Sequence, residues 1–310
     1  MTEPASPIDL ANTSCGFIAL VGAPNAGKST LLNSLVGTKV SIVTHKAQTT
    51  RSQVRGVLTL DQAQLVFIDT PGIFAPKKRL ERAMVENAWG GAGDADLVAF
   101  ILDADRGITP ETEALLEGLE NITHPKVLIL NKIDTVKHES LLALSQSLNE
   151  RLRFEATFML SALKGDGVSD FISWCVKHIP PGPWHFPEDH LTDLTMAITA
   201  AEVTREKLFL RVHDEIPYNS TVETESFKIQ KDGSYKIDQV IYLSRESHKK
   251  IVLGAGGQTI KAIGAEARKE LMEMYEVPIH LFLFVKVREK WTDDPERYRE
   301  MGLEFPHGKA

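Results

Sequence analysis

The residues best suited to chemistry lie early in the chain, from Gly22 to Ser29, where the sequence reads Gly-Ala-Pro-Asn-Ala-Gly-Lys-Ser. This order fits the phosphate-binding loop pattern G-x-x-x-x-G-K-[ST] without a mismatch. A loop with so little side-chain bulk exposes its backbone N–H groups to phosphate oxygens, and a helix that begins there adds its dipole. Lys28 is then expected to reach the β- and γ-phosphates, and the Ser29 hydroxyl to bind Mg²⁺. The sequence therefore predicts a nucleoside triphosphate site.

Three shorter patterns, each at the end of a predicted strand, favour guanine over adenine. Asp-Thr-Pro-Gly at 69–72 supplies a carboxylate that can hold Mg²⁺ through water and a Gly72 backbone that can sense the γ-phosphate. Asn-Lys-Ile-Asp at 131–134 supplies a carboxylate for N1–H and the exocyclic amine of guanine, two donors that adenine does not present together. Ser-Ala-Leu at 161–163 can offer a backbone N–H to the guanine carbonyl oxygen. The predicted nucleotide-binding residues are Gly22, Ala23, Pro24, Asn25, Ala26, Gly27, Lys28, Ser29, Thr30, Asp69, Thr70, Pro71, Gly72, Ile73, Asn131, Lys132, Ile133, Asp134, Ser161, Ala162 and Leu163.

The residue after Gly72 bears on the rate of hydrolysis. Many GTPases place there a glutamine that orients the attacking water. This chain has Ile73, which can neither orient water nor act as a base. We therefore expect slow unassisted hydrolysis of GTP to GDP and phosphate.

Length and composition describe a globular protein of about two domains. The 310 residues are 43% hydrophobic and 25% charged, and no apolar run is long enough to span a bilayer. Two cysteines and an N-terminus without a signal-peptide core indicate a cytoplasmic protein. The net charge of −7 argues against a nucleic-acid partner, but residues 245–290 hold nine Lys or Arg against six Glu.

The order of predicted elements changes once along the chain. In the first half, strands at 15–21, 63–69, 96–104, 126–132 and 156–162 alternate with amphipathic helices, which predicts a parallel, doubly wound α/β sheet. Four prolines within 179–190 then indicate a boundary, and the second half follows the α+β order helix–strand–strand–helix–helix–strand. We predict an N-terminal extension over 1–15, a nucleotide-binding domain over 16–179, a linker over 180–194, a second domain over 195–290 and a tail over 291–310.

A glycine-rich loop in the second half is a candidate RNA clamp. Gly254-Ala255-Gly256-Gly257 lies between two predicted helices, and such a G-x-x-G loop lets an RNA backbone approach closely in KH domains of type II. Ala255 stands where many such loops carry a basic residue, so phosphate attraction is assigned to neighbouring side chains. The predicted RNA-binding residues are Lys249, Lys250, Gly254, Ala255, Gly256, Gly257, Lys261 and Arg268.

Taken together, the phosphate loop, Lys-Ala-Gln-Thr-Thr-Arg at 46–51, the Asp-Thr-Pro-Gly pattern and the second domain resemble the Era family of bacterial GTPases, within the TrmE-Era-EngA-like superfamily, from about Gly16 to about Lys290. The resemblance implies a P-loop GTPase domain followed by a type II KH domain, with Lys28, Thr50 and Gly72 as catalytic residues. It implies Mg²⁺ held by Ser29, Thr50 and Asp69, and K⁺ held by Asn25. Thr49 remains the competing choice for the switch threonine.

The same resemblance implies the partners. It predicts GTP and GDP as ligands, the 3′ end of 16S ribosomal RNA as target and a role in 30S subunit assembly, in a monomer that associates peripherally with the inner membrane. Two alternatives stay open: a signalling GTPase that contacts a protein or membrane surface, and a constitutive RNA-binding module with a vestigial nucleotide site. The intact Lys28, Ser29, Asp69 and Asp134 argue against the second of these.

Overall fold

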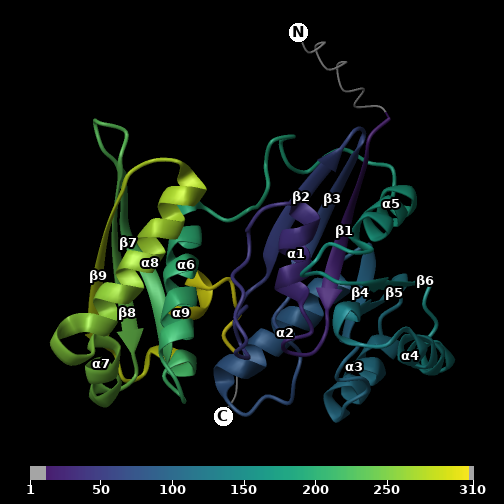
Figure 1. Ribbon diagram of the computed structural model, residues 1–310, viewed down its shortest axis with the longest axis horizontal. Coiled ribbons are helices and arrows are strands. Elements are labelled where there is room, and N and C mark those ends of the chain that lie inside the picture. Colours follow the sequence, from purple (N-terminus) through teal and green to yellow (C-terminus); the bar gives the residue numbers. More distant parts are fainter. Residues whose placement is uncertain (1–11, 307–310) are drawn as a thin grey trace, which may run out of the picture. The chain divides into compact units, whose positions relative to one another are not determined.

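A computed structural model of the chain describes residues 12–306 and divides it into two compact units (Figure 1). The first unit comprises 1–41, 50–77 and 81–193, and the second comprises 42–49, 78–80 and 194–310. Two short segments from the first half of the sequence therefore belong to the second unit. Among the described residues, no helix has both the length and the apolar character that a membrane span requires.

The first unit is built on a six-stranded sheet with strand order β2-β3-β1-β4-β5-β6. Its strands are β1 (Ser14–Val21), β2 (Val54–Leu60), β3 (Ala63–Asp69), β4 (Leu97–Asp103), β5 (Lys126–Asn131) and β6 (Ala156–Leu160). Every residue of β3 and β4 is buried, as expected for central strands covered on both faces. The predicted α/β class is confirmed.

Helices cover both faces of this sheet. They are α1 (Lys28–Val36), α2 (Arg79–Gly93), α3 (Pro110–Glu120), α4 (His138–Arg151) and α5 (Val168–His178). Apolar residues of α2, α3 and α4 form one core with β1, β4 and β5, whereas α1 and α5 pack on β3 from the other side. This is the doubly wound arrangement, in which loops after the strands meet at one edge of the sheet.

The prediction of an entirely parallel sheet was wrong at one strand. The pattern-based assignment contained no strand between 37 and 62, yet β2 pairs with β3 in antiparallel register from Val54↔Asp69 to Leu60↔Ala63. Gly56 in the middle of β2 lowers the strand propensity. A Cβ at this position would lie 2.6 Å from a Leu32 methyl of α1, so the glycine lets helix and strand approach.

The second unit follows the predicted α+β order. Its elements are α6 (Met196–Arg211), β7 (Ser220–Ile229), β8 (Tyr235–Leu243), α7 (Glu246–Leu253), α8 (Gln258–Tyr275) and β9 (Ile279–Val287). β8 lies between an antiparallel β7 and a parallel β9. Helices α6 and α8 pack on one face of this sheet through two apolar clusters (Figure 1). A short helix, α9 (Pro295–Glu300), lies in the segment predicted as a tail.

Residues 42–49 are held to helix α6 within this unit. The buried Arg205 guanidinium donates to the Thr49 carbonyl oxygen at 2.5 Å, and the Val43 N–H donates to a Glu206 carboxylate oxygen at 2.8 Å. Lys46 donates to the carbonyl oxygens of Phe209 and Val212, where the helix ends. Helix C-terminal carbonyls lack intrahelical partners, so a lysine there is a favourable cap.

The predicted extension 1–15 and tail 291–310 lie partly outside the described residues, at 1–11 and 307–310. Strand β1 begins at Ser14, within the last two residues of that extension.

Candidate functional site

The phosphate loop joins β1 to α1 with an unusual backbone path. Asn25 and Gly27 have φ values of 65° and 97°, and Gly27 is the N-cap residue directly before α1. A Cβ on Gly22 would lie 2.4 Å from the Ile101 carbonyl oxygen, and one on Gly27 would lie 2.2 Å from the Asn131 amide nitrogen. Both pattern glycines are therefore required sterically, and the α1 N-terminus stays open to an anion.

Lys28 is almost completely buried beneath this loop. Its ammonium donates to the carbonyl oxygens of Gly22 and Ala23 at 3.1 and 3.0 Å. Burial lowers its pKa to about 8, against the opposing effect of Asp69. A nucleotide phosphate would supply the negative charge that these neutral carbonyls only partly replace.

Three hydroxyl groups converge on the buried Asp69 carboxylate. Its Oδ2 accepts from Ser29 at 2.6 Å, Ser41 at 2.9 Å and Thr50 at 3.2 Å, and the Ser29 and Thr50 hydroxyl oxygens lie 2.9 Å apart. Burial raises the pKa of Asp69, so the charged form lacks full compensation. Its Oδ1 is buried and has no hydrogen-bond partner among the described residues. Oxygen ligands with an unsatisfied carboxylate oxygen fit Mg²⁺.

The geometry separates the two candidate switch threonines. Thr50 faces Ser29 and Asp69 as described above, whereas the Thr49 hydroxyl contacts the Thr44 hydroxyl at 2.6 Å and donates to the Lys46 carbonyl at 2.7 Å. Of the two threonines, Thr50 is therefore the one whose hydroxyl lies beside the oxygens of Ser29 and Asp69.

The Asp-Thr-Pro-Gly segment runs close to the phosphate loop. A Cβ on Gly72 would lie 2.9 Å from backbone atoms of Pro24, and the Ile73 N–H donates to the Gly22 carbonyl oxygen at 3.2 Å. The Thr70 hydroxyl donates to the Leu20 carbonyl oxygen at 2.8 Å. Ile73 itself is only 7% exposed and belongs to the core formed with α2, α3 and α4. Its side chain is therefore packed in the core and not exposed in the loop.

Asn131 connects the phosphate loop to the loop after β6. Its amide nitrogen donates to the Ala26 carbonyl oxygen at 2.8 Å, and its oxygen accepts from the N–H groups of Lys132 and Ala162 at 2.8 and 3.0 Å. The Lys132 ammonium lies 2.6 Å from an Asp103 carboxylate oxygen. One buried side chain thus fixes the separation between the phosphate end and the base end of the site.

Asp134 is oriented by Ser161 at the base end. The Ser161 hydroxyl donates to Asp134 Oδ1 at 2.7 Å, and Lys164 lies 3.6 Å from Oδ2. These contacts, with the Ser161 hydrogen bond as the largest cause, lower the pKa of Asp134. The carboxylate is therefore ionised and acts only as an acceptor, which suits the two adjacent donors of guanine.

The G-x-x-G loop in the second unit lies between α7 and α8. Gly254, Gly256 and Gly257 all have positive φ values, between 57° and 77°. A Cβ on Gly254 would lie 2.2 Å from the Thr259 hydroxyl oxygen, whereas one on Gly256 would meet nothing within 4 Å. Gly254 therefore allows the tight turn between α7 and α8, and the space beside Gly256 is open to a ligand backbone.

The basic residues predicted around this loop lie on both helices. Lys249 and Lys250 are near the end of α7, and Lys249 pairs with Glu246 at 3.6 Å. Lys261 and Arg268 lie seven residues apart and so share one face of α8, but Arg268 is about 15 Å along the helix from its start.

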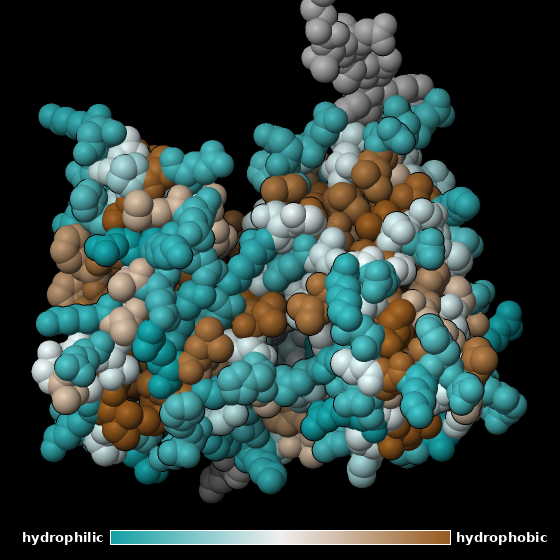
Figure 2. Space-filling model, in the orientation of Figure 1, coloured by the Kyte–Doolittle hydropathy of each residue, from teal (hydrophilic) through white to brown (hydrophobic). Residues whose placement is uncertain are grey.

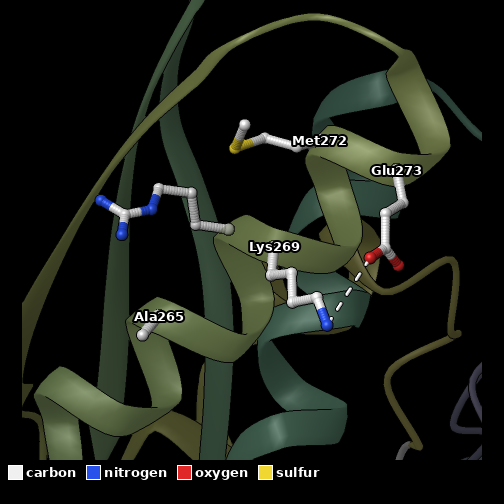
Figure 3. Close-up of a pocket in the computed structure, with 5 residues that line it drawn as sticks. Ala265, Lys269, Met272 and Glu273 are labelled. Carbon is white, nitrogen blue, oxygen red and sulfur yellow. Dashed lines mark ion pairs between the residues drawn. The ribbon is translucent and has the colours of Figure 1, made fainter.

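Arg268 also lines a shallow pocket on α8 with Ala265, Lys269, Met272 and Glu273 (Figure 3). Figure 3 shows Met272 pointing to the strand side of the helix and Lys269 paired with Glu273 on the other side. Gly264 on this helix approaches Leu283 of β9, because a Cβ there would lie 3.3 Å from a leucine methyl. The basic face of α8 therefore adjoins β9.

Two participating residues were not anticipated from the sequence. Ser41 contacts Asp69 although 28 residues separate them, and Asp103 anchors Lys132. Ser41 belongs to no motif, and only the folded sheet brings it to the site. Asp103 lies near the end of the strand predicted over 96–104, which pairs with β5. That position could have indicated that its side chain lies near the residues that follow β5.

Comparisons with known proteins agree with these two sites. Residues 17–132 match the family described as 50S ribosome-binding GTPase, and residues 215–292 match the KH domain. The chain is 61% identical to GTPase Era of Mesorhizobium japonicum over 95% of each chain, and 58% identical to GTPase Era of Brucella suis over 98% of each chain.

Two solved structures are similar over 94% of this chain and 99% of their own chains, each with a TM-score of 0.88 and 37% identity. One is Era in complex with MgGDPNP and nucleotides 1506–1542 of 16S ribosomal RNA. The other is Aquifex aeolicus Era with the substitution Y63A, bound to GDP.AlF4−.

Proposed function

Because the chain belongs to the Era family of GTPases, we propose that it is a GTP-switched factor that binds the 3′ end of 16S ribosomal RNA and assists assembly of the 30S subunit. The observation that carries the proposal is the presence, in one chain, of a complete guanine-nucleotide site and an open G-x-x-G loop. The bound nucleotide, GTP or GDP, would set the state of the switch, and the G-x-x-G loop would bind the RNA.

The protein is a GTPase, and we propose that its own residues make the reaction slow. We propose that the backbone of the phosphate loop and Lys28 bind and orient the phosphates, while Asp134 selects guanine. Gly72, held against Pro24, would place its N–H near the γ-phosphate. With Ile73 in the core, no side chain at that position orients water. Positioning and charge neutralisation are then the main sources of catalysis.

Mg²⁺ and K⁺ are supported by different observations. Mg²⁺ is bound with GDPNP in the solved relative, and Ser29, Thr50 and Asp69 are the residues proposed to hold it here. When bound, Mg²⁺ neutralises charge on the β- and γ-phosphates. We further propose that Asn25 helps to hold K⁺ against the same phosphates. Its left-handed backbone conformation fixes its place in the loop.

Potassium dependence provides a direct test of the second ion. GTP turnover is expected to be faster in KCl than in NaCl at equal ionic strength, and Asn25→Ala should remove that difference. Ser34→Ala, farther along α1 and outside the predicted nucleotide-binding residues, is the control that should keep it. Equal rates in the two salts would contradict a role for K⁺.

The small subunit is favoured over the large one as the target. The family description that names the 50S subunit covers residues 17–132, without the RNA-binding unit. The relative that contains 16S RNA aligns over 94% of the chain, including that unit. On the protein side, the α8 N-terminus is uncapped by any described side chain, and Lys250 and Lys261 are exposed on either side of the loop. These features suit a single-stranded phosphate backbone.

Two variants with opposite defects test the proposal. Gly256→Asp places a carboxylate where the RNA backbone should pass, and should abolish binding of 16S nucleotides 1506–1542 while GTP affinity is kept. Asp134→Asn should weaken GTP binding by about 1–3 kcal/mol, because an amide NH2 group, which is a donor, replaces one of the two acceptor oxygens. It should leave RNA binding by the nucleotide-free protein intact. Binding of both variants to RNA with wild-type affinity would disprove the RNA site.

The remaining parts of the proposal follow from the same family membership. We propose that the protein works in the cytoplasm, where ribosomal subunits assemble. Its monomeric state and its peripheral association with the inner membrane stay predictions. Sedimentation with and without vesicles measures both. The alternative of a signalling GTPase would be favoured by vesicle binding without any binding of RNA.

A further inference from the structure

The sheet of the second unit has a face that is turned away from helices α6 and α8. Side chains alternate along β9: Leu281, Leu283 and Val285 pack into the apolar clusters with these helices. Phe282 and Phe284 therefore point to the opposite face, where they are 47% and 52% exposed. Figure 2 shows apolar atoms at the surface beside β9.

Only one half of this outer face is covered by the described part of the chain. Arg297 of α9 lies over the Tyr242 ring at 4.9 Å and pairs with Glu223, so the end of the sheet near Tyr242 is buried. Phe282 and Phe284 lie outside that cover. Two large aromatic side chains on one open face of this unit indicate a binding surface.

Lysines and carboxylates both surround the two rings. Lys236 on β8 lies 5.5 Å from the centre of the Phe282 ring, and Lys286 and Lys228 lie on the same face of the sheet. Glu225 pairs with Lys286 at 2.8 Å, and Asp238 lies 3.7 Å from the Lys236 ammonium. Beside the rings, three lysines thus stand against two carboxylates, each of which is paired with a lysine, and farther along the face Glu223 pairs with Arg297.

We propose that Phe282 and Phe284 form a second contact surface for single-stranded RNA, on the side of the sheet opposite the helices. Residues two apart on a strand lie about 6.6 Å apart, so neighbouring bases of one strand can each stack on one ring. Exposed aromatics on a sheet, flanked by lysines that attract phosphates, are a recurrent solution for RNA without strict sequence choice. The inference rests on the proposed function, because it extends the RNA path beyond the G-x-x-G loop.

The composition of the surface favours RNA over other occupants. Residues 307–310, His-Gly-Lys-Ala, contain no large apolar side chain that could cover two phenylalanines. A protein partner would be expected to meet aliphatic side chains as well, but the neighbouring Val240 is fully buried. The accessible face presents two aromatic rings and three lysines beside the partly exposed Glu225 and Asp238, and the rings and lysines complement bases and phosphates.

Two RNA lengths and three substitutions test this surface. The double variant Phe282→Ala/Phe284→Ala should bind 16S nucleotides 1506–1542 at least about 5-fold more weakly, since each stacked base contributes measurably. Its affinity for a four-nucleotide RNA, which the G-x-x-G loop alone can hold, should not change. Phe282→Trp/Phe284→Trp should keep binding, and Phe282→Leu/Phe284→Leu should lose it.

A control variant on the other face of the sheet tests whether the effect is specific to the two rings. Ile229→Ala removes an exposed apolar residue from the helix side of the same sheet and should have no effect. Wild-type affinity of the alanine or leucine double variant for the long RNA overturns the proposal. If the leucine variant binds the long RNA like wild type, an apolar surface is sufficient and the face is better suited to a protein partner. If the alanine variant loses self-association in sedimentation, the face binds a second copy of the chain. If wild-type protein binds neither RNA, both this inference and the proposed RNA function are wrong.

Discussion

At the scale of single residues, the proposed nucleotide site is held together by hydrogen bonds among its own side chains and backbone. Asn131 spans the distance between the phosphate loop and the base loop, and Ser161 orients Asp134. Such contacts place donors and acceptors before the ligand arrives, which lowers the free-energy cost of ordering them on binding.

Ile73 gives the first prediction at this scale. Ile73→Gln introduces the residue that many GTPases use, but it places an amide in the core with α2, α3 and α4. We expect a loss of about 1–3 kcal/mol in the free energy of unfolding and no acceleration of GTP turnover. Denaturant unfolding and single-turnover kinetics measure the two effects. Val85→Gln, on a partly buried position of the same cluster, is the control for stability, and faster turnover of the Ile73 variant would refute the placement of this side chain.

The motif residues could be predicted from the sequence because each motif is contiguous and its chemistry is local. The phosphate loop, Asp69 and Asp134 needed only a strand ending beside them. Ser41 could not be predicted, since its contact with Asp69 exists only after β3 is packed into the sheet. Spacing left Thr49 and Thr50 equivalent, and hydrogen-bond geometry distinguishes them.

At the scale of elements, the helices and buried strands followed apolar periodicity closely, whereas two elements did not. β2 contains Gly56, whose role is to admit α1, so its sequence lacks a continuous strand pattern. Helix α9 is only six residues long, too short for any periodicity, and is held by a proline at its first turn, the Asp294 cap and contacts of Arg297 with the sheet.

The contact between α9 and β7 predicts a dependence of stability on pH. Burial, together with the nearby Glu300 charge, raises the pKa of Glu223 from 4.5 to about 7 despite its pairing with Arg297. The folded state therefore holds a proton that the unfolded state releases between these pH values. The stability contributed by this group is fully present below pH 4.5 and is lost as the pH rises through about 7.

Glu223→Gln isolates this effect. The variant keeps an acceptor for Arg297 but cannot ionise, so its free energy of unfolding should fall less than that of wild type between pH 4.5 and 7, by about 1–3 kcal/mol. Chemical denaturation at a series of pH values provides the comparison. Glu225→Gln, whose pKa is lowered by the hydrogen bond from Lys286, should not reproduce it. Parallel pH profiles for wild type and Glu223→Gln would contradict the assignment.

At the scale of the whole molecule, the switch segment is shared between the two units by sequence. Thr50 contacts Ser29 and Asp69 in the first unit, while Thr49, the preceding residue, accepts from Arg205 of α6 in the second. We therefore expect a change at Thr50 on loss of the γ-phosphate to reach Thr49, the adjacent residue, and its hydrogen bond from Arg205. Coupling of this kind is reciprocal, so RNA should also tighten GTP binding.

Arg205→Ala tests this route. In wild type we expect the RNA affinity of the protein bound to GDP to differ from that of the protein bound to a non-hydrolysable GTP analogue. The expected difference is roughly 5- to 150-fold, which is typical of such coupling. The variant should bring the two affinities together, because Thr49 loses its anchor. Arg211→Ala removes an exposed arginine that pairs with Glu266 on the same helix and should leave the difference intact. An unchanged ratio in Arg205→Ala would exclude this route.

The placement of 42–49 and 78–80 in the second unit also limits how the gene can be divided. A fragment that ends in the proline-rich segment would carry Lys46 without the helix end that it caps, and Arg79 without Asp293, its partner at 2.8 Å. Recombination at this boundary would exchange one RNA-binding module for another. In the recombinant proteins, residues 42–49 and 78–80 would then face a module with which they did not evolve. A functional chimera would need compensating changes inside the GTPase sequence, so the two halves are expected to be inherited together.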